Sequence, residues 1–241
     1  MKLSVIVPAF NEEKLITSCL VSIRAATAAC EREGLEVEII VVDNASSDDT
    51  ARLAARRGAR VVREPVRQIA RARNAGAAVA RGDWLLFVDA DSWPSRALMR
   101  EVFACMHDAR IVGGGSTVRV RDVPLALTLV GVSWNALSRL CRWAAGSFIF
   151  CRATAFNAIG GFDVEFFAAE EIDFSRRLKR WARSRGQRFV ILHRHPLLTS
   201  ERRATLYSQR ELFVSFWRML RHPRRFFRDP RLCHPWYDGR R

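Results

Sequence analysis

Hydrophobic and polar positions follow two different periods along the first half of the chain. Continuous apolar runs at residues 3–7, 37–42, 60–62 and 84–88 each stop at a polar turn, as buried strands do. Between them, residues 12–33, 48–57 and 69–80 carry apolar side chains at helical spacing, and Asn11 is expected to cap the first helix. Strands that alternate with helices over short connections predict an α/β fold with a mostly parallel central sheet and helices on both faces.

The second half has a looser pattern. It predicts strands at residues 116–120, 147–151 and 188–192, and helices at 125–143 and 170–183. Beyond them, residues 206–227 mix aromatic and basic side chains at helical spacing. We therefore expect one domain over residues 1–200. Residues 201–241 would form a helical, basic and aromatic-rich C-terminal extension, packed on that domain or on a membrane surface.

Polar clusters follow several of the predicted strands, at residues 8–13, 43–50 and 89–91, and another opens a helix at 170–173. In open parallel sheets, ligands bind at the ends of the strands, so these clusters are the candidate site. No strand is followed by a GxGxxG motif or a Walker lysine, which disfavours dinucleotide dehydrogenases and P-loop NTPases. The six cysteines form no CxxC pair, which argues against a zinc knuckle.

Two aspartates one residue apart, Asp89 and Asp91, follow the strand at 84–88. Two carboxylates held this close repel each other unless a cation neutralises them, and a hard divalent ion that also binds substrate phosphates would do so. The alternative is a pair of helix-capping aspartates ahead of Pro94. Asp43, at the end of an earlier strand, suits a hydrogen bond to a nucleotide base or ribose, although it also fits a polar turn.

The predicted helix at 170–183 begins with three acids, Glu170, Glu171 and Asp173. Acids in a first turn suit the helix dipole, and a general base is the functional alternative. His193 and His195 share one face of a strand end, and His195 would complete a metal shell if it lay beside Asp91. A structural role for these histidines is the other interpretation.

The chain has an ordinary composition for a globular protein, with 49% hydrophobic and 27% charged residues. The chain contains no run of about twenty apolar residues, so the sequence predicts no membrane-spanning helix. The apolar run at the N-terminus is too short for a secretory signal. We therefore expect a cytoplasmic protein.

The net charge of +15 arises entirely in the last quarter of the chain. Residues 1–175 hold 21 basic and 21 acidic side chains, whereas residues 176–241 hold 19 basic and 4 acidic ones. Such a one-sided charge predicts an anionic partner. Phe213, Phe216, Trp217 and Leu220 fall on one helical face of this segment, beside several arginines. This pattern favours peripheral attachment to the inner face of the cytoplasmic membrane, with packing on the domain at 1–200 as the alternative and nucleic acid disfavoured.

Five motifs in order resemble the inverting family-2 glycosyltransferases, whose nucleotide-binding fold is called GT-A. They are SVIVPAFNEE at 4–13, VVDNASSDDT at 41–50, RNAGA at 73–77, LFVDAD at 86–91, and GGFD at 160–163 leading to EEID at 170–173. The resemblance extends over residues 3–195.

This resemblance implies roles for matching positions. Glu171 would be the catalytic base; it stands where the family has Asp, one methylene shorter, so Glu170 and Asp173 remain alternatives. Asp91 and His195 would hold Mn²⁺ or Mg²⁺ against the donor diphosphate. The residues implied to contact the donor nucleotide are Pro8, Ala9, Phe10, Glu12, Asp43, Asn44, Arg67, Asn74, Asp89 and Ala90.

The implied activity is transfer of a sugar from a nucleoside-diphosphate-sugar to an acceptor hydroxyl. The acceptor would be lipid-linked or a glycan, as in the synthesis of a cell-envelope polysaccharide or glycolipid. Nucleotidyl transfer is a weaker alternative, because the first strand is not followed by a Gly-rich phosphate loop. A second alternative is a non-catalytic nucleotide- or nucleic-acid-binding protein that uses the Arg-rich tail.

Overall fold

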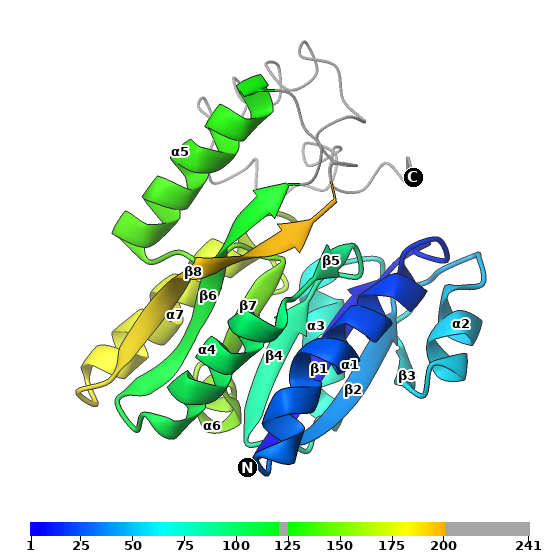
Figure 1. Cartoon of the computed structure of the whole chain (residues 1–241), viewed down its shortest axis with the longest axis horizontal. Helices are drawn as coiled ribbons and strands as arrows, with labels where there is room; N and C mark the ends of the chain where they lie inside the picture. Colours follow the sequence, from blue (N-terminus) through cyan, green and yellow to red (C-terminus); the bar gives the residue numbers. More distant parts are fainter. Residues whose placement is uncertain (121–124, 201–241) are drawn as a thin grey trace.

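The computed structural model describes residues 1–120 and 125–200, with side chains described for 1–120 and 131–200 (Figure 1). The predicted extension at 201–241 therefore lies outside the described residues. None of the helices within the described part is long and apolar enough to cross a membrane. The elements are β1 (Lys2–Ala9), α1 (Ile16–Arg32), β2 (Glu36–Asp43), α2 (Thr50–Arg56), β3 (Arg60–Arg63), α3 (Ile69–Val79), β4 (Trp84–Val88), β5 (Ser92–Trp93), α4 (Arg96–His107), β6 (Ile111–Val120), α5 (Leu125–Cys141), β7 (Phe148–Arg152), α6 (Ala153–Ala158), α7 (Glu170–Arg183) and β8 (Arg188–Thr199).

The strands of the described residues form one eight-stranded sheet in the order β3-β2-β1-β4-β7-β6-β8-β5. The first four are mutually parallel, as the sequence predicts. β7 runs antiparallel to both β4 and β6, β8 is parallel to β6, and β5 is antiparallel to β8. Ala9 pairs with Asp43, so the carboxyl ends of β1 and β2 lie level at one edge of the sheet.

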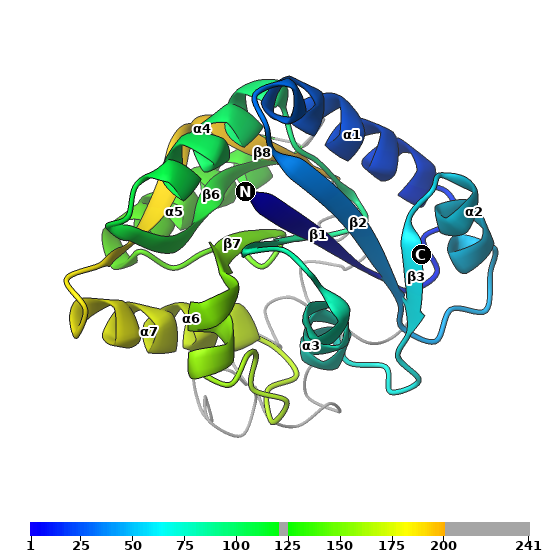
Figure 2. The same cartoon turned by 90° about the horizontal axis from the view of Figure 1, so that it is seen from below.

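Helices cover both faces of the sheet, as predicted. Figure 2 shows α1 and α4 on one face and α3, α6 and α7 on the other. Val5 of β1 packs in the first core with Leu20 of α1, whereas the next residue, Ile6, joins the second core with Phe174 of α7. Burying a large apolar side chain contributes about 1.5–3 kcal/mol, so both helical layers hold the sheet that presents the site.

The start of α1 differs from the prediction. The helix begins at Ile16 with Leu15 at its N-cap, so Asn11 is not the cap. Asn11 instead has a φ of 52°, a left-handed conformation that Asn tolerates better than most residues. Its Oδ1 accepts a hydrogen bond of 2.8 Å from the Ser47 amide, which ties the loop after β1 to the turn after β2.

The second half contains more regular structure than the sequence analysis predicts. Helices α4 and α6 were not predicted, β6 starts at Ile111 rather than at residue 116, and β8 continues to Thr199. The first half of β6 was not predicted, because it is rich in glycine, which is uncommon in strands. These glycines are required by close packing: an added Cβ would lie 2.5 Å from the Phe150 carbonyl at Gly113 and 2.6 Å from the Ala144 Cβ at Gly115.

Candidate active site

A cavity of about 360 Å³ opens at the carboxyl ends of β1, β2 and β4. The first turns of α3 and the loop before it, the start of α7, the loop before β7, one residue of α5 and the ends of β6 and β8 complete its wall. This is the edge at which open α/β sheets bind ligands. The residues predicted from the sequence that line it are Pro8, Ala9, Phe10, Glu12, Asn44, Arg67, Asp89, Ala90, Asp91 and Glu171.

The wall formed by the loop after β1 carries a stacked pair. The guanidinium carbon of Arg67 lies 3.8 Å from the centre of the Phe10 ring, a cation–π contact. Asn44 fixes the loop that carries Arg67, because its amide donates to the carbonyls of Glu64 and Val66 at 3.0 and 2.7 Å. The Asn44 side chain thus acts on the cavity wall through the backbone that it holds.

Asp43 and Asn74 do not line the cavity. Asp43 is buried, and its Oδ1 accepts a 3.0 Å hydrogen bond from the Ser46 amide in the turn after β2. Asn74 of α3 binds the backbone of Phe162 twice, by its Oδ1 at 2.9 Å and its Nδ2 at 2.8 Å. Asn74 therefore anchors the glycine loop that precedes α7, and its side chain does not reach the cavity in which the nucleotide was expected to bind.

A buried arginine connects the two sides of the cavity. Arg73 of α3 donates from Nη1 to Glu170 at 2.5 Å, and from Nη2 to Asp89 at 3.3 Å and to the Gly146 carbonyl at 2.7 Å. Its side chain is 2% exposed and that of Glu170 is 6% exposed. Buried charges persist in proteins when they are paired and hydrogen-bonded, as here. Sequence analysis placed Arg73 in a family motif but assigned it no role.

The three acids that begin α7 have different surroundings. Glu170 is paired with Arg73, and Asp173 pairs with Arg177 at 2.6 Å and does not line the cavity. Glu171 lines the cavity, and burial followed by repulsion from Glu170 raises the pKa of Glu171 from 4.5 to about 8. A carboxyl group with a raised pKa in a cavity is suited to proton transfer near neutral pH.

Asp89 and Asp91 do not cap the helix that follows them. The cap of α4 is Ser95, whose side chain accepts from the Leu98 amide at 3.1 Å. Asp91 is 7% exposed, and its Oδ2 accepts a 2.8 Å hydrogen bond from the Ser200 hydroxyl. The Ser200 amide also donates to the Asp91 carbonyl at 3.1 Å, which joins the end of β8 to the Asp91 loop.

His195 is not brought to Asp91, so the expected pair of metal ligands does not form. The pairing of β6 with β8 passes from Ser116–Leu192 to Val118–Leu197, which leaves four β8 residues opposite a single β6 residue. This irregularity turns His195 away from the cavity, and its Nδ1 lies 2.6 Å from the Glu101 carboxylate of α4. The sequence showed the histidine but not the irregularity that displaces it.

The donor groups at Asp91 fit a divalent cation that is shared with a substrate. The described residues contain no group of three or more His, Cys, Asp or Glu side chains arranged to hold a metal. Mg²⁺ and Mn²⁺ at phosphate-transfer sites bind one or two carboxylates and complete their shells with phosphate oxygens and water. The Asp91 carboxylate and the Ser200 hydroxyl are hard oxygen donors on the cavity wall, whereas Asp89 is engaged by Arg73.

Comparison with known proteins identifies the family. The family model described as glycosyl transferase family 2 matches residues 4–130, more than half of the chain. The chain belongs to this family. The match contains the first four of the five motifs and every predicted nucleotide residue, and all of these residues except Asp43 and Asn74 line the cavity.

Individual relatives agree with this family assignment. An uncharacterized glycosyltransferase, EpsJ of Bacillus subtilis, is 33% identical over 119 residues, which are 46% of this chain and 33% of EpsJ. The mannosyltransferase PcManGT of Pyrobaculum calidifontis, solved with GDP-Man and Mn²⁺, has a TM-score of 0.65 at 22% identity and matches 91% of this chain and 60% of its own. TarS 1–349 of S. aureus, solved with UDP-GlcNAc, has a TM-score of 0.64 at 23% identity, covering 91% and 65%.

These similarities confirm the predicted GT-A fold. The family-2 chain spans about a third of the curated relative that it matches. Besides Arg73, sequence analysis assigned no cavity contact to several other wall residues, most of which stand outside the polar motifs and come from β6 or from later segments of the chain. They are Ile69, Val118, Val120, Trp134, Ala145, Gly146, Ser147, Ala169, Glu170, Thr199 and Ser200, of which Glu170 was weighed only as an alternative base.

Proposed function

We propose that this chain is an inverting glycosyltransferase that moves a sugar from a nucleoside-diphosphate-sugar to an acceptor hydroxyl with the help of Mn²⁺ or Mg²⁺. The observation that carries the proposal is one cavity whose wall holds Asp91 on one side and Glu171 on the other, with Arg73 joining the two sides. Two structurally similar enzymes were solved with GDP-Man and UDP-GlcNAc, which supports a nucleotide-sugar donor.

The donor would lie along the wall formed by the ends of β1, β2 and β4. Phe10 and Arg67 offer a flat stacked surface for a nucleobase, and Asp89 would face the ribose or the sugar. Asp43 lies buried at the end of β2, so a contact with the base would require its carboxylate to reach past the Ser46 turn.

In the proposed reaction, Glu171 removes the proton of the acceptor hydroxyl. The resulting oxygen attacks the anomeric carbon from the face opposite the diphosphate, and a single displacement inverts that centre. Asp91 and Ser200 would hold the divalent cation, which when bound neutralises charge on the leaving diphosphate. Glu170 stays paired with Arg73 and keeps Glu171 in a negative environment that favours the uptake of a proton.

The acceptor would enter along the wall made by Val118, Val120 and Trp134. An aromatic ring beside apolar side chains suits the flat face of a sugar or the start of a lipid chain. This supports a glycan or lipid-linked acceptor, in keeping with synthesis of an envelope polysaccharide or glycolipid. Residues 206–227, which lie outside the described residues, are proposed to attach the protein peripherally to the inner face of the cytoplasmic membrane.

Donor turnover tests the reaction. The purified chain would be incubated with a panel of nucleoside-diphosphate-sugars and Mn²⁺, with release of nucleoside diphosphate as the readout. We expect one donor to be consumed, and NMR of the sugar released to water should report an anomeric configuration opposite to that of the donor. Retention of configuration would overturn the single-displacement mechanism, and a Glu171→Gln variant that consumes the donor as fast as the wild type would overturn the role of Glu171.

A further inference from the structure

A second cavity, of about 350 Å³, lies where the end of α5, the later part of α7 and the start of β8 meet (Figure 1). Four of its lining residues are cationic: Arg142, Lys179, Arg183 and Arg188. No acidic side chain lines it among the described residues. The catalytic proposal assigns no role to this basic cavity.

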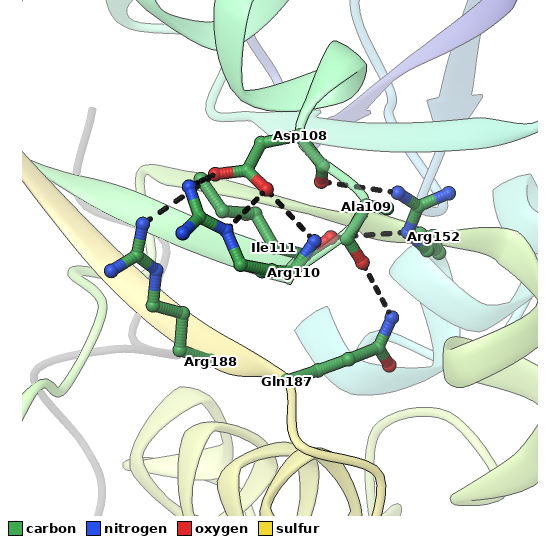
Figure 3. Close-up of polar contacts among 7 residues, drawn as sticks. All are labelled: Asp108, Ala109, Arg110, Ile111, Arg152, Gln187 and Arg188. Atoms are coloured by element: carbon green, nitrogen blue, oxygen red, sulfur yellow. Dashed lines mark hydrogen bonds and ion pairs between the residues drawn. The ribbon is translucent and has the colours of Figure 1, made fainter.

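One of the four cations is neutralised from within the protein. Figure 3 shows the Arg188 guanidinium directed at Asp108, with the Nη2 and Oδ2 atoms 3.5 Å apart. Asp108 is shared with Arg110, whose Nε lies 3.0 Å from its Oδ1. Gln187 donates to the Ala109 carbonyl at 2.9 Å, so the same loop also fixes the β8 side of the cavity.

The other three cations have no carboxylate within ion-pair distance in the part of the chain that the structure describes. Lys179 donates from Nζ to the Cys141 carbonyl at 2.5 Å, and burial together with Arg183 lowers the pKa of Lys179. Arg142 stands at the end of α5 with a φ of 50°. Cations gathered in a concave site without an internal counter-charge create a local positive potential that attracts an anion.

An apolar stripe on α5 adjoins the basic cavity. Val132, Leu137 and Leu140 are 59%, 41% and 84% exposed, and Leu140 also lines the cavity. On the same helix, Trp134 lines the first cavity, which is the candidate active site. Exposed apolar side chains next to cations are the signature of a surface that rests on an anionic membrane. A soluble anion would need the cations alone.

We propose that the basic cavity and the α5 stripe form a membrane-docking surface, in which the cavity binds the phosphate of an anionic lipid headgroup and the stripe contacts the acyl region. This proposal deepens the peripheral attachment proposed above. It rests on the proposed function only for the nature of the acceptor, and it does not depend on residues 206–227. Since α5 contributes to both cavities, docking would bring the acceptor wall at Trp134 close to the lipid surface.

Vesicle co-sedimentation of the full-length chain tests the basic cavity. The vesicles would be phosphatidylcholine with or without phosphatidylglycerol. Lys179→Gln combined with Arg183→Gln removes two charges, and the new amide at 179 can still donate to Cys141. Each basic residue near an anionic surface contributes about fivefold, so we expect roughly a 25-fold loss of partitioning to the anionic vesicles. The matched control, Arg56→Gln with Arg57→Gln at the end of α2, removes the same charge from exposed positions and should change partitioning little.

The stripe has its own variant and control. Leu140→Ser alters an 84% exposed side chain, and Val21→Ser alters a 50% exposed side chain on α1. We expect Leu140→Ser to lose about tenfold in partitioning, because a leucine would no longer enter the apolar layer, and Val21→Ser to behave as wild type. Unchanged binding of the basic-cavity variant, or equal losses in either matched control, would overturn the proposal.

A soluble ligand would give a different pattern. If inorganic phosphate raised the melting temperature of the wild type but not of the Lys179/Arg183 variant, while Leu140→Ser kept full vesicle binding, the cavity would bind free phosphate and the lipid assignment would be wrong. Nucleotide-sugar binding should be unchanged in all these variants. Its absence in every variant and in the wild type would count against the proposed function and leave the docking result standing.

Discussion

The buried Arg73 is the residue whose removal should have the largest structural consequence at the cavity. Replacing it with Met keeps most of the apolar stem but removes the guanidinium that binds Glu170, Asp89 and the Gly146 carbonyl. Glu170, whose side chain is 6% exposed, would then be an uncompensated buried charge. Breaking a buried ion pair from one side costs about 3–5 kcal/mol, and we expect Arg73→Met to lower the free energy of unfolding by that amount.

Urea unfolding followed by circular dichroism measures this loss. Adding Glu170→Gln to Arg73→Met removes the stranded charge, so the double variant should recover about 2 kcal/mol relative to the single one. Arg52→Met is the matched control, because Arg52 pairs with Asp49 on the exposed surface of α2 and its loss should not be measurable. An Arg73→Met protein as stable as the Arg52→Met protein, or a double variant without any recovery, would refute the buried-pair reasoning.

Other predictions concern Glu171 and Asn74. The kcat/KM of the wild type should rise with pH through about 8, because Glu171 can accept a proton only when it is ionised, above its raised pKa. The Glu171→Gln variant should have a kcat lower by about 10²–10⁴ and an unchanged affinity for the donor. A pH-independent rate in the wild type would argue against this base. The raised pKa also makes the contribution of Glu171 to folding depend on pH: it is fully present below pH 4.5 and is lost as the pH rises to about 8. Urea titrations over this window should therefore show the free energy of unfolding of the wild type falling relative to that of Glu171→Gln. Asn74→Ala should lower the free energy of unfolding, measured with urea, by about 1–3 kcal/mol, because two hydrogen bonds to Phe162 are lost. Replacing the exposed Asn157 with Ala should leave the free energy of unfolding unchanged. Equal effects of the two substitutions would contradict the anchoring role.

The fold and half of the cavity were predictable because they depend on local patterns. Each strand from β1 to β4 is an apolar run that ends in a polar turn, and parallel pairing brings those turns to one edge. Pro8, Asp89 and Asp91 could therefore be placed from their distance to the end of a strand. No long-range information was needed beyond the handedness of the connections.

The remaining features depend on contacts between residues far apart in the chain. Arg73 sits in an Ala-rich helix, and its partners lie 16, 73 and 97 residues away, so nothing local indicates that it is buried. The displacement of His195 results from irregular pairing of β6 with β8, which the alternation of side chains does not show. Trp134 reaches the cavity from the predicted helix at 125–143, whose pattern marked no individual residue as part of a site.

The measurement that tests the central claim most directly is a thermal-shift screen of nucleoside diphosphates and their sugars, with and without Mn²⁺, on the wild type and on Asp91→Ala. A ligand at a hundred times its Kd stabilises the folded state by about 2.7 kcal/mol, enough to raise the melting temperature measurably. The account predicts a shift with one nucleotide that requires the metal and disappears in Asp91→Ala. A well-folded wild type that shows no shift with any nucleotide, or a metal-dependent shift that persists in Asp91→Ala, would contradict it.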